Sequence, residues 1–260
     1  MCCFSRPVKE VSSTNIFARS DGLHRQFIVY AMSIETETDV AMILPLPVKV
    51  PAGERDVTFI NLKDCPEFFE RMSEGFPILE APVSLGLSVV TDGVAKTALK
   101  VMQVGDFEAS FVPTVKDFAR LDDRFRIAPD VWKKLPGYDD HGFAVFKLKP
   151  GAAHIHPMAF SFPRRDNSRL FFPTVHIHDG QVHIFAEFDH NLYCQRNDDD
   201  LNLLDWDESH GHAASFMPIE KTKILIAPDQ HCYRRVLSGV RPNRDTWLTS
   251  AMASPHGKPS

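Results

Sequence analysis

The sequence predicts an α+β fold built mainly from antiparallel β-sheet, in a sandwich-like or meander-like arrangement with a few short helices. The main observation is a series of segments rich in β-branched, aliphatic and aromatic residues, joined by turn residues. Four of these segments follow one another directly, which is typical of an antiparallel meander. They are residues 143–148, 154–162, 170–178 and 181–188.

The composition favours one folded domain. The chain has 260 residues, of which 43% are apolar and 24% are charged, as is usual for globular proteins. This length is at the upper end of what one hydrophobic core can hold. We therefore expect a single domain over residues 1–260, with residues 254–260 as a frayed tail.

The first part of the chain should contain strands and one helix. Residues 26–34 and 40–46 have the residue types of strands. Asp64 and Glu67 have the spacing of a helix capping box, and Gly75 suits the C-terminal end of that helix. Its apolar stripe would be Phe68, Phe69 and Met72.

A hairpin around Gly105-Asp106 is the next expected element, because two strand-like segments flank this turn pair. Thr114 is a plausible cap for a short helix that ends at Leu121. The remaining expected elements are a helix over residues 129–135 and strands over residues 223–227 and 231–237.

The charge and hydropathy patterns exclude several partners. A net charge of -5 leaves no basic surface for nucleic acid, and no run of about 18 uncharged apolar residues could cross a membrane. The N-terminus lacks the basic and apolar regions of an export signal. Five cysteines at scattered positions favour reduced thiols. We therefore expect a cytoplasmic protein.

Histidines are concentrated in the second half of the chain, where ten of the twelve lie between His141 and His231. Strand side chains alternate between faces, so each His-x-His pair places both imidazoles on one side, about 7 Å apart. Asp179-Gly180 has the signature of a type I′ hairpin turn, which would place His176 opposite His183.

The preceding strand can be aligned with this hairpin if residues 163–169 form the connecting loop. His156 then faces His176, and His154 faces His178. Imidazole is the commonest ligand of zinc, copper and non-haem iron. The expected metal ligands are His154, His156, His176, His178 and His183.

This constellation favours a metal-dependent enzyme. Many imidazoles and few carboxylates favour copper or iron, and hence an oxidoreductase, although zinc is possible. Glu187 and Asp189 lie on the same face as His183 and could orient a ligand or act as a base. The sequence does not indicate whether the substrate is a small molecule or a peptide. The alternatives are a non-catalytic metal-binding or interaction protein, a structural or pH-sensing histidine cluster, and a metal-free acid–base site.

Cys2 suggests a hypothesis of another class. Removal of Met1 would leave a cysteine whose own α-amino group is a base, as in N-terminal nucleophile hydrolases. Cys2 and Cys3 could instead bind the metal as thiolates.

Three segments resemble an uncharacterised bacterial family of domains of unknown function. They are Cys3-Phe4, the Leu-Pro-Leu-Pro segment at residues 44–47, and residues 143–150. Members of that family begin with cysteines, carry a similar Leu-Pro-x-Pro strand and are typically exported and membrane-anchored. The resemblance covers roughly residues 2–178 and implies one continuous domain, but no activity.

Overall fold

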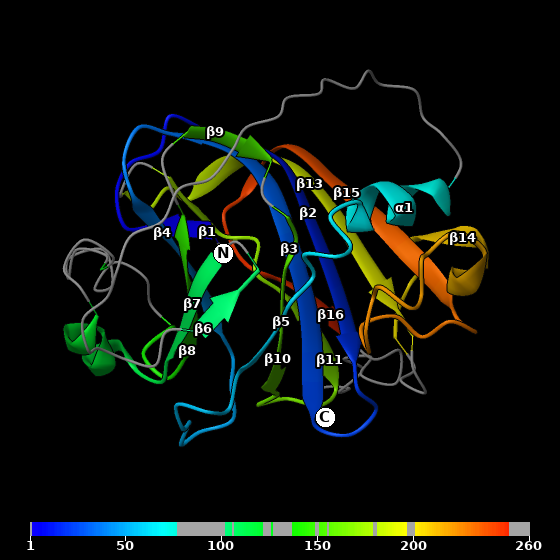
Figure 1. Ribbon diagram of the computed structural model, residues 1–260, viewed down its shortest axis with the longest axis horizontal. Helices are drawn as coiled ribbons and strands as arrows, with labels where there is room; N and C mark the ends of the chain where they lie inside the picture. The colour runs from blue at the N-terminus through cyan, green and yellow to red at the C-terminus, as the bar shows by residue number, and fades with distance from the viewer. Residues whose placement is uncertain are drawn as a thin grey trace, which may run out of the picture.

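The protein folds around two large β-sheets, which Figure 1 shows side by side. The computed structural model describes residues 2–76, 102–105, 107–121, 126, 137–148, 151–154, 156–178, 181–196 and 201–249. The first sheet has six strands. In spatial order they are β12 (His176–Ile177), β1 (Cys2–Phe4), β4 (Val40–Leu46), β8 (Gly142–Leu148), β7 (Phe107–Val112) and β6 (Met102–Val104).

The second sheet has eight strands. In spatial order they are β14 (Asp207–His212), β15 (His231–Pro242), β13 (Phe185–Gln195), β2 (Glu10–Ser20), β3 (Arg25–Thr36), β10 (Met158–Pro163) and β5 (Thr58–Ile60), and β9 (Gly151–His154) also pairs with β3. A small separate sheet consists of β11 (Arg169–Phe172) and β16 (Thr246–Thr249).

The β-rich character predicted from the sequence is confirmed, but the two large sheets are mixed. β1 runs parallel to β12, and β2 runs parallel to β13, while the other described pairs are antiparallel. Helical structure is limited in the described residues to α1 (Phe68–Glu74) and the 3₁₀ segments η1 (Val115–Arg120) and η3 (Ala213–Ser215). None of the helices described is long and apolar enough to cross a membrane.

Parts of both large sheets are covered on two faces, which explains why β3, β4 and β8 are buried along most of their length. In β2, Ile16 belongs to the core between the sheets, while Phe17 points to the other side and contacts Phe68 of α1. In the six-stranded sheet, Phe146 faces the central core and Phe143 packs against Phe118 of η1. The alternation of polar and apolar residues expected for a half-exposed sheet is therefore absent in these strands.

Several expected elements differ from the structure. The helix begins at Phe68, with Glu67 as its N-cap and no side-chain capping bond, because Asp64 lies in a preceding turn. The segment after Thr114 is a 3₁₀ helix, in which the Thr114 hydroxyl donates to Asp117 instead of capping a backbone amide. Residues 223–227 form turns, since Lys223 has a φ of 58°. The expected helix over residues 129–135 and the tail 254–260 lie outside the described residues.

The hairpin at Gly105 is confirmed, with Val104 opposite Phe107. Gly105 has a φ of +60°, and a Cβ atom there would lie 2.5 Å from His156 Nε2. That imidazole cannot move away easily, since it packs on Phe107 with ring centroids 4.2 Å apart. We expect Gly105→Ala to lower the free energy of unfolding by about 1–3 kcal/mol, measured by denaturant titration.

Gly22 provides the matched control for this substitution. It has a φ of +80° but nothing within 4 Å of its would-be Cβ. Gly22→Ala should therefore show only the backbone strain, about 1 kcal/mol. Equal losses in the two variants would contradict a steric contribution from His156.

Candidate functional site

The strand register that brought five histidines together is wrong. β10 pairs with β3 and β5, whereas β11 pairs with β16, so these two consecutive strands are not neighbours. β12 pairs with β1, and β13 pairs with β2 and β15, so His176 is not opposite His183. The Asp179-Gly180 turn itself lies outside the described residues. Each strand prefers a partner that is distant in sequence, which local turn signals cannot reveal.

Three of the expected ligands lie apart from the others. The backbone of His154 ends β9 opposite Ser33, and its side chain is outside the described part. His156 is buried against Phe107, and its Nδ1 lies 3.2 Å from the Pro157 carbonyl. His183 is exposed just before β13. Within the described residues, no group of three or more His, Cys, Asp or Glu side chains is placed so that it could hold a metal ion.

His176 and His178 do lie together, and His190 of β13 joins them. The ring centroid of His176 is 4.9 Å from that of His178 and 4.6 Å from that of His190. Phe188 forms the apolar wall of this group, with its ring 4.5 Å from His176. We call His176, His178 and His190 the imidazole cluster. It connects β12 of the six-stranded sheet with β13 of the eight-stranded sheet.

The environment of the imidazole cluster favours neutral rings. Burial, together with the neighbouring His190 and His178, lowers the pKa of His176 to about 2. Burial also lowers the pKa of His190, although Asp189 opposes this effect. The side chain of His190 is only 1% exposed. His176 Nε2 and His190 Nδ1 are buried and make no hydrogen bond to any described residue.

The sequence contained a signal for His190 that spacing alone did not reveal. Phe188, His190 and Leu192 alternate along β13 on the face that is buried in the core. A histidine on such an apolar face must be buried, and a buried imidazole needs a partner. The buried His190 is therefore a stronger candidate for a site residue than the exposed His183.

The two expected catalytic carboxylates, Glu187 and Asp189, lie on the opposite, exposed face of β13. Asp189 accepts a hydrogen bond from the backbone N–H of Ser13, 2.5 Å away. Ser13 has a φ of 53° and lies where the register of β2 shifts against β3. Asp189 therefore holds a β-bulge in place, and its other neighbour is His190 Nδ1 at 3.4 Å.

Cys2 pairs through its backbone with His176, because β1 runs parallel to β12. The N-terminal strand therefore lies directly beside the imidazole cluster. The side chain of Cys2 is not among those described, so its role as a nucleophile or a metal ligand stays a prediction. Cys3, the neighbouring residue, is fully buried.

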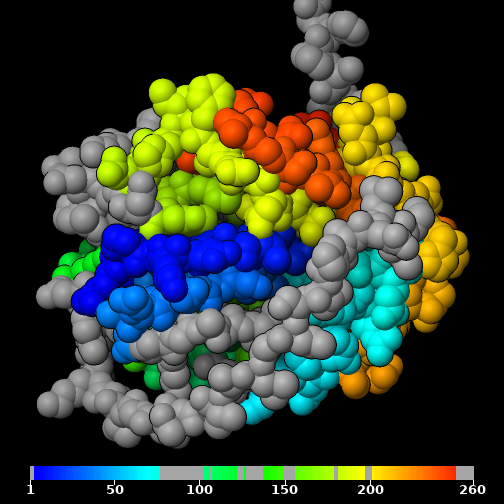
Figure 2. All heavy atoms as spheres, turned by 90° about the horizontal axis from the view of Figure 1, so that it is seen from above, coloured from blue at the N-terminus to red at the C-terminus, as the bar shows by residue number. Residues whose placement is uncertain are grey.

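The outer side of β15 is the second notable feature of this region. β15 pairs with β13 over residues 232–242, but β14 pairs with it only as far as Arg234. From Arg235 to Pro242, no strand of the described chain occupies the other side of β15. We call residues 235–242 the open edge. Figure 2 shows the orange-red atoms of β15 on the outer rim of the molecule, beside the yellow atoms of β13.

The end of the open edge is held firmly against the rest of the protein. The side chain of Asn243 accepts a hydrogen bond from the His176 N–H (2.7 Å) and donates to the carbonyls of His176 (2.9 Å) and His183 (3.0 Å). Asp245 accepts hydrogen bonds from the backbone N–H groups of Thr174 and Val175. The position of the open edge is therefore fixed before any partner binds.

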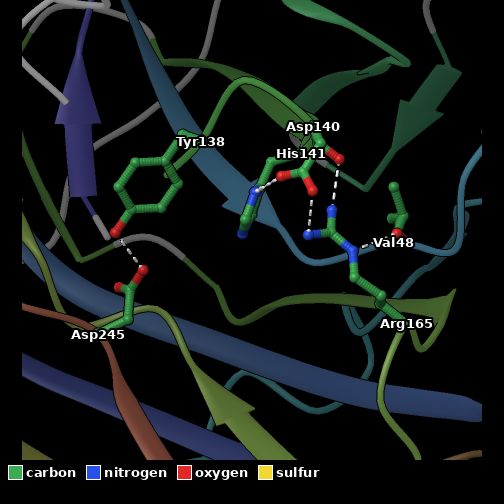
Figure 3. A network of polar contacts seen from close by, with 6 residues as sticks. All are labelled: Val48, Tyr138, Asp140, His141, Arg165 and Asp245. Atoms are coloured by element: carbon green, nitrogen blue, oxygen red, sulfur yellow. Dashed lines mark hydrogen bonds and ion pairs between the residues drawn. The ribbon is translucent and has the colours of Figure 1, made fainter. Parts of the chain in front are cut away.

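A polar network continues from Asp245 across the surface (Figure 3). The hydroxyl of Tyr138 donates a hydrogen bond to the carboxylate of Asp245, 2.5 Å away. Asp140 then bridges His141, whose Nδ1 is 3.1 Å away, and Arg165, whose Nη1 is 2.6 Å away. Arg165 also donates to the carbonyl of Val48. Burial and the nearby Arg165 lower the pKa of His141, so this network stabilises loops and has no charged imidazole at neutral pH.

No protein-family model matches the sequence. The resemblance to an uncharacterised bacterial family therefore stays a prediction. Among solved structures, the chain is similar to baculovirus P35, with 15% identity, a TM-score of 0.49, and coverage of 93% of this chain and 97% of that chain. It is also similar to P35 in a complex with caspase-8, with 12% identity, a TM-score of 0.48, and coverage of 92% and 96%. At these values the likeness assigns no activity to this chain.

Proposed function

We propose that the protein acts by binding an extended segment of another protein along the open edge of β15. The observation that carries this proposal is the free side of residues 235–242, which the described chain leaves without a neighbouring strand. Such edges are templates for strand addition, in which an extended peptide joins a sheet through backbone hydrogen bonds. Eight residues in a strand are about 26 Å long, enough for a specific peptide contact.

The backbone groups available to a partner can be assigned. The Arg241 side chain donates to the Ser238 carbonyl, 2.9 Å away, so this carbonyl is turned away from β13. Outward-facing residues alternate along a strand, and the register with β13 continues through Gly239, which has a φ of +74°. Val236, Ser238 and Val240 therefore present their N–H and C=O groups to a partner, which would displace the Arg241 side chain.

The side chains of the open edge define the chemistry of the partner. Val240 and Val236 are 74% and 49% exposed, and they favour β-branched or other apolar residues in the added strand. Arg235 and Arg241 lie on the opposite face of β15, six residues apart. They favour carboxylates at the two ends of the bound segment.

Charge also disfavours a second copy of this chain as the partner. An antiparallel pair of two β15 strands centred on Ser238 would place Arg235 opposite Arg241. Like charges directly opposite each other destabilise a strand pair. The expected partner is therefore a different protein, with β-branched residues flanked by acidic residues.

A designed peptide tests this proposal. In Glu-Val-Thr-Thr-Thr-Val-Glu, blocked at both ends, the valines meet Val236 and Val240 and the glutamates meet the two arginines. We expect a dissociation constant between about 10 µM and 1 mM, measured by fluorescence anisotropy. N-methylation of the central threonine should abolish binding, because its N–H faces Ser238, whereas N-methylation of either adjacent threonine should be tolerated.

Val240→Lys should weaken binding of this peptide about tenfold or more without affecting the fold. Leu23→Lys is the matched control, because Leu23 is 72% exposed in a distant turn. Absence of binding at about 1 mM, or equal binding by both variants, would show that the open edge does not add a strand.

This proposal corresponds to the interaction-protein alternative from the sequence. The hypothesis of a copper or iron oxidoreductase has less support, because the five expected ligands are distributed over separate parts of the fold. Glu187 and Asp189 border the open edge, where they add acidic groups next to Val240 and Ser238.

A further inference from the structure

We infer that Phe185, with Pro242 and Val240 beside it, binds one large aromatic side chain of the partner segment. We call these three residues the apolar platform. The inference rests on the proposed function, because it names a further feature of the segment that binds along the open edge. It also fixes the position of that segment, since the platform lies at only one end of the open edge.

The backbone of the open edge stops supporting an added strand at Pro242. Proline has no N–H group, and the Pro242 carbonyl already accepts a hydrogen bond from the N–H of Arg244, 3.0 Å away. The N–H of Asn243 donates to the Ile184 carbonyl at 2.8 Å, so residue 243 faces β13 and Pro242 faces outwards. Recognition of a partner beyond Val240 must therefore rely on side chains.

The three side chains of the platform lie on one face of the sheet. Phe185 of β13 is the partner of Pro242 in β15, and Val240 is two residues away along the same strand. Pairs that exchange no hydrogen bonds bring their side chains closest, and Phe185 and Pro242 form such a pair, because the bond runs between the adjacent residues 184 and 243. Phe185 is 59% exposed and Val240 is 74% exposed, so the described chain leaves most of the platform uncovered.

Exposed apolar side chains are concentrated around this platform. Half of the large apolar side chains that are exposed in the described residues lie on β15 or at the start of β13, namely Ile184, Phe185, Val236 and Val240. The others lie singly in separate segments, at Leu23, Val50, Leu204 and Ile224. Single exposed apolar side chains are normal, whereas a group of them beside a free sheet edge is typical of a protein-binding surface.

The geometry favours an aromatic side chain on the platform. Neighbouring strands are about 4.8 Å apart, so an added strand lies about 10 Å from β13, with β15 in between. A small side chain opposite Pro242 cannot reach Phe185 over that distance, whereas an aromatic ring that leans across the proline can pack on the Phe185 ring. Glu187 lies on the same face of β13 and provides an acceptor for the N–H of an indole. Tryptophan is therefore the expected residue.

Two extended forms of the designed peptide test this inference. In an antiparallel alignment, a residue added before the first glutamate lies opposite Pro242, whereas a residue added after the last glutamate lies opposite Arg234, where β14 already pairs with β15. We expect Trp-Glu-Val-Thr-Thr-Thr-Val-Glu to bind about tenfold more tightly than Ser-Glu-Val-Thr-Thr-Thr-Val-Glu, measured by isothermal titration calorimetry with blocked peptides. Glu-Val-Thr-Thr-Thr-Val-Glu-Trp is the control of identical composition and should gain less than about twofold over the serine peptide.

Phe185→Ala should reduce the preference for tryptophan over serine to about twofold or less and leave binding of the serine peptide unchanged. Leu23→Ala is the matched control, because Leu23 is 72% exposed in a distant turn, and it should retain the full preference. An equal gain from tryptophan at either end of the peptide, or a preference that survives in Phe185→Ala, would overturn the inference.

The serine peptide separates this inference from the proposed function. If it binds and the tryptophan peptide binds no more tightly, the open edge adds a strand but Phe185 does not hold an aromatic side chain. Absence of binding by all three peptides at about 1 mM would refute the proposed function, and this inference with it.

Discussion

Replacing Phe146 by alanine is expected to lower the free energy of unfolding by about 3–5 kcal/mol. Phe146 is fully buried in β8, and its ring contacts Phe59, Phe107 and Phe160 at centroid distances of 5.5, 6.2 and 5.9 Å. Phe160 belongs to the other large sheet, so this aromatic group joins the two sheets. Alanine would remove the transfer free energy of the ring and leave a cavity where the sheets meet.

Denaturant titration monitored by circular dichroism measures this loss. Phe185→Ala is the matched control, because Phe185 is 59% exposed at the start of β13 and should cost less than about 1 kcal/mol. Phe146→Leu should cost less than Phe146→Ala, since the leucine side chain fills part of the space. A loss below about 1 kcal/mol in Phe146→Ala would mean that the two sheets do not share this core.

The strands themselves could be predicted where the signal is local. Residues 40–46 and 107–112 were expected as strands and correspond to β4 and β7. β2 was missed, because its first half is polar and contains the bulge at Ser13, so it lacks the pattern of a strand. The pairing of strands could not be predicted, since β13 joins β2 from the far end of the chain and turn residues carry no information about such a partner.

The candidate site could be predicted only in part, for the same reason. His176 and His178 lie together because two positions along a strand place side chains on one face. His190 joins them because β13 of one sheet lies against β12 of the other, which is a tertiary contact. The open edge is likewise a property of the sheet order, because a sequence does not show which strand is last in a sheet.

Asp245 is the residue on which the loops around the site depend most. Its carboxylate accepts hydrogen bonds from the backbone N–H groups of Thr174 (2.9 Å) and Val175 (3.1 Å) and from the hydroxyl of Tyr138 (2.5 Å). These contacts hold the segment after β15 against the segment before β12. Burial and the nearby Asp245 raise the pKa of Tyr138, so its hydroxyl stays a donor at any physiological pH.

Asp245→Ala is therefore expected to lower the free energy of unfolding by about 2–4 kcal/mol, because three donors lose a charged acceptor. Asp245→Asn should cost less, since its carbonyl oxygen can still accept from the two backbone amides. Tyr138→Phe should cost about 1 kcal/mol, and a double-mutant cycle between Tyr138→Phe and Asp245→Asn would give their coupling energy.

Asp139→Ala serves as the control, because Asp139 is an exposed carboxylate one residue from Tyr138 and should change stability by less than about 0.5 kcal/mol. The loss of stability in Asp245→Ala should also destabilise the open edge, since Asn243 and Asp245 belong to the segment that follows it. Amide hydrogen exchange of residues 235–242 should accelerate in this variant and stay unchanged in Asp139→Ala. Unchanged exchange in both variants, together with unchanged stability, would mean that Asp245 does not hold the end of β15 in place.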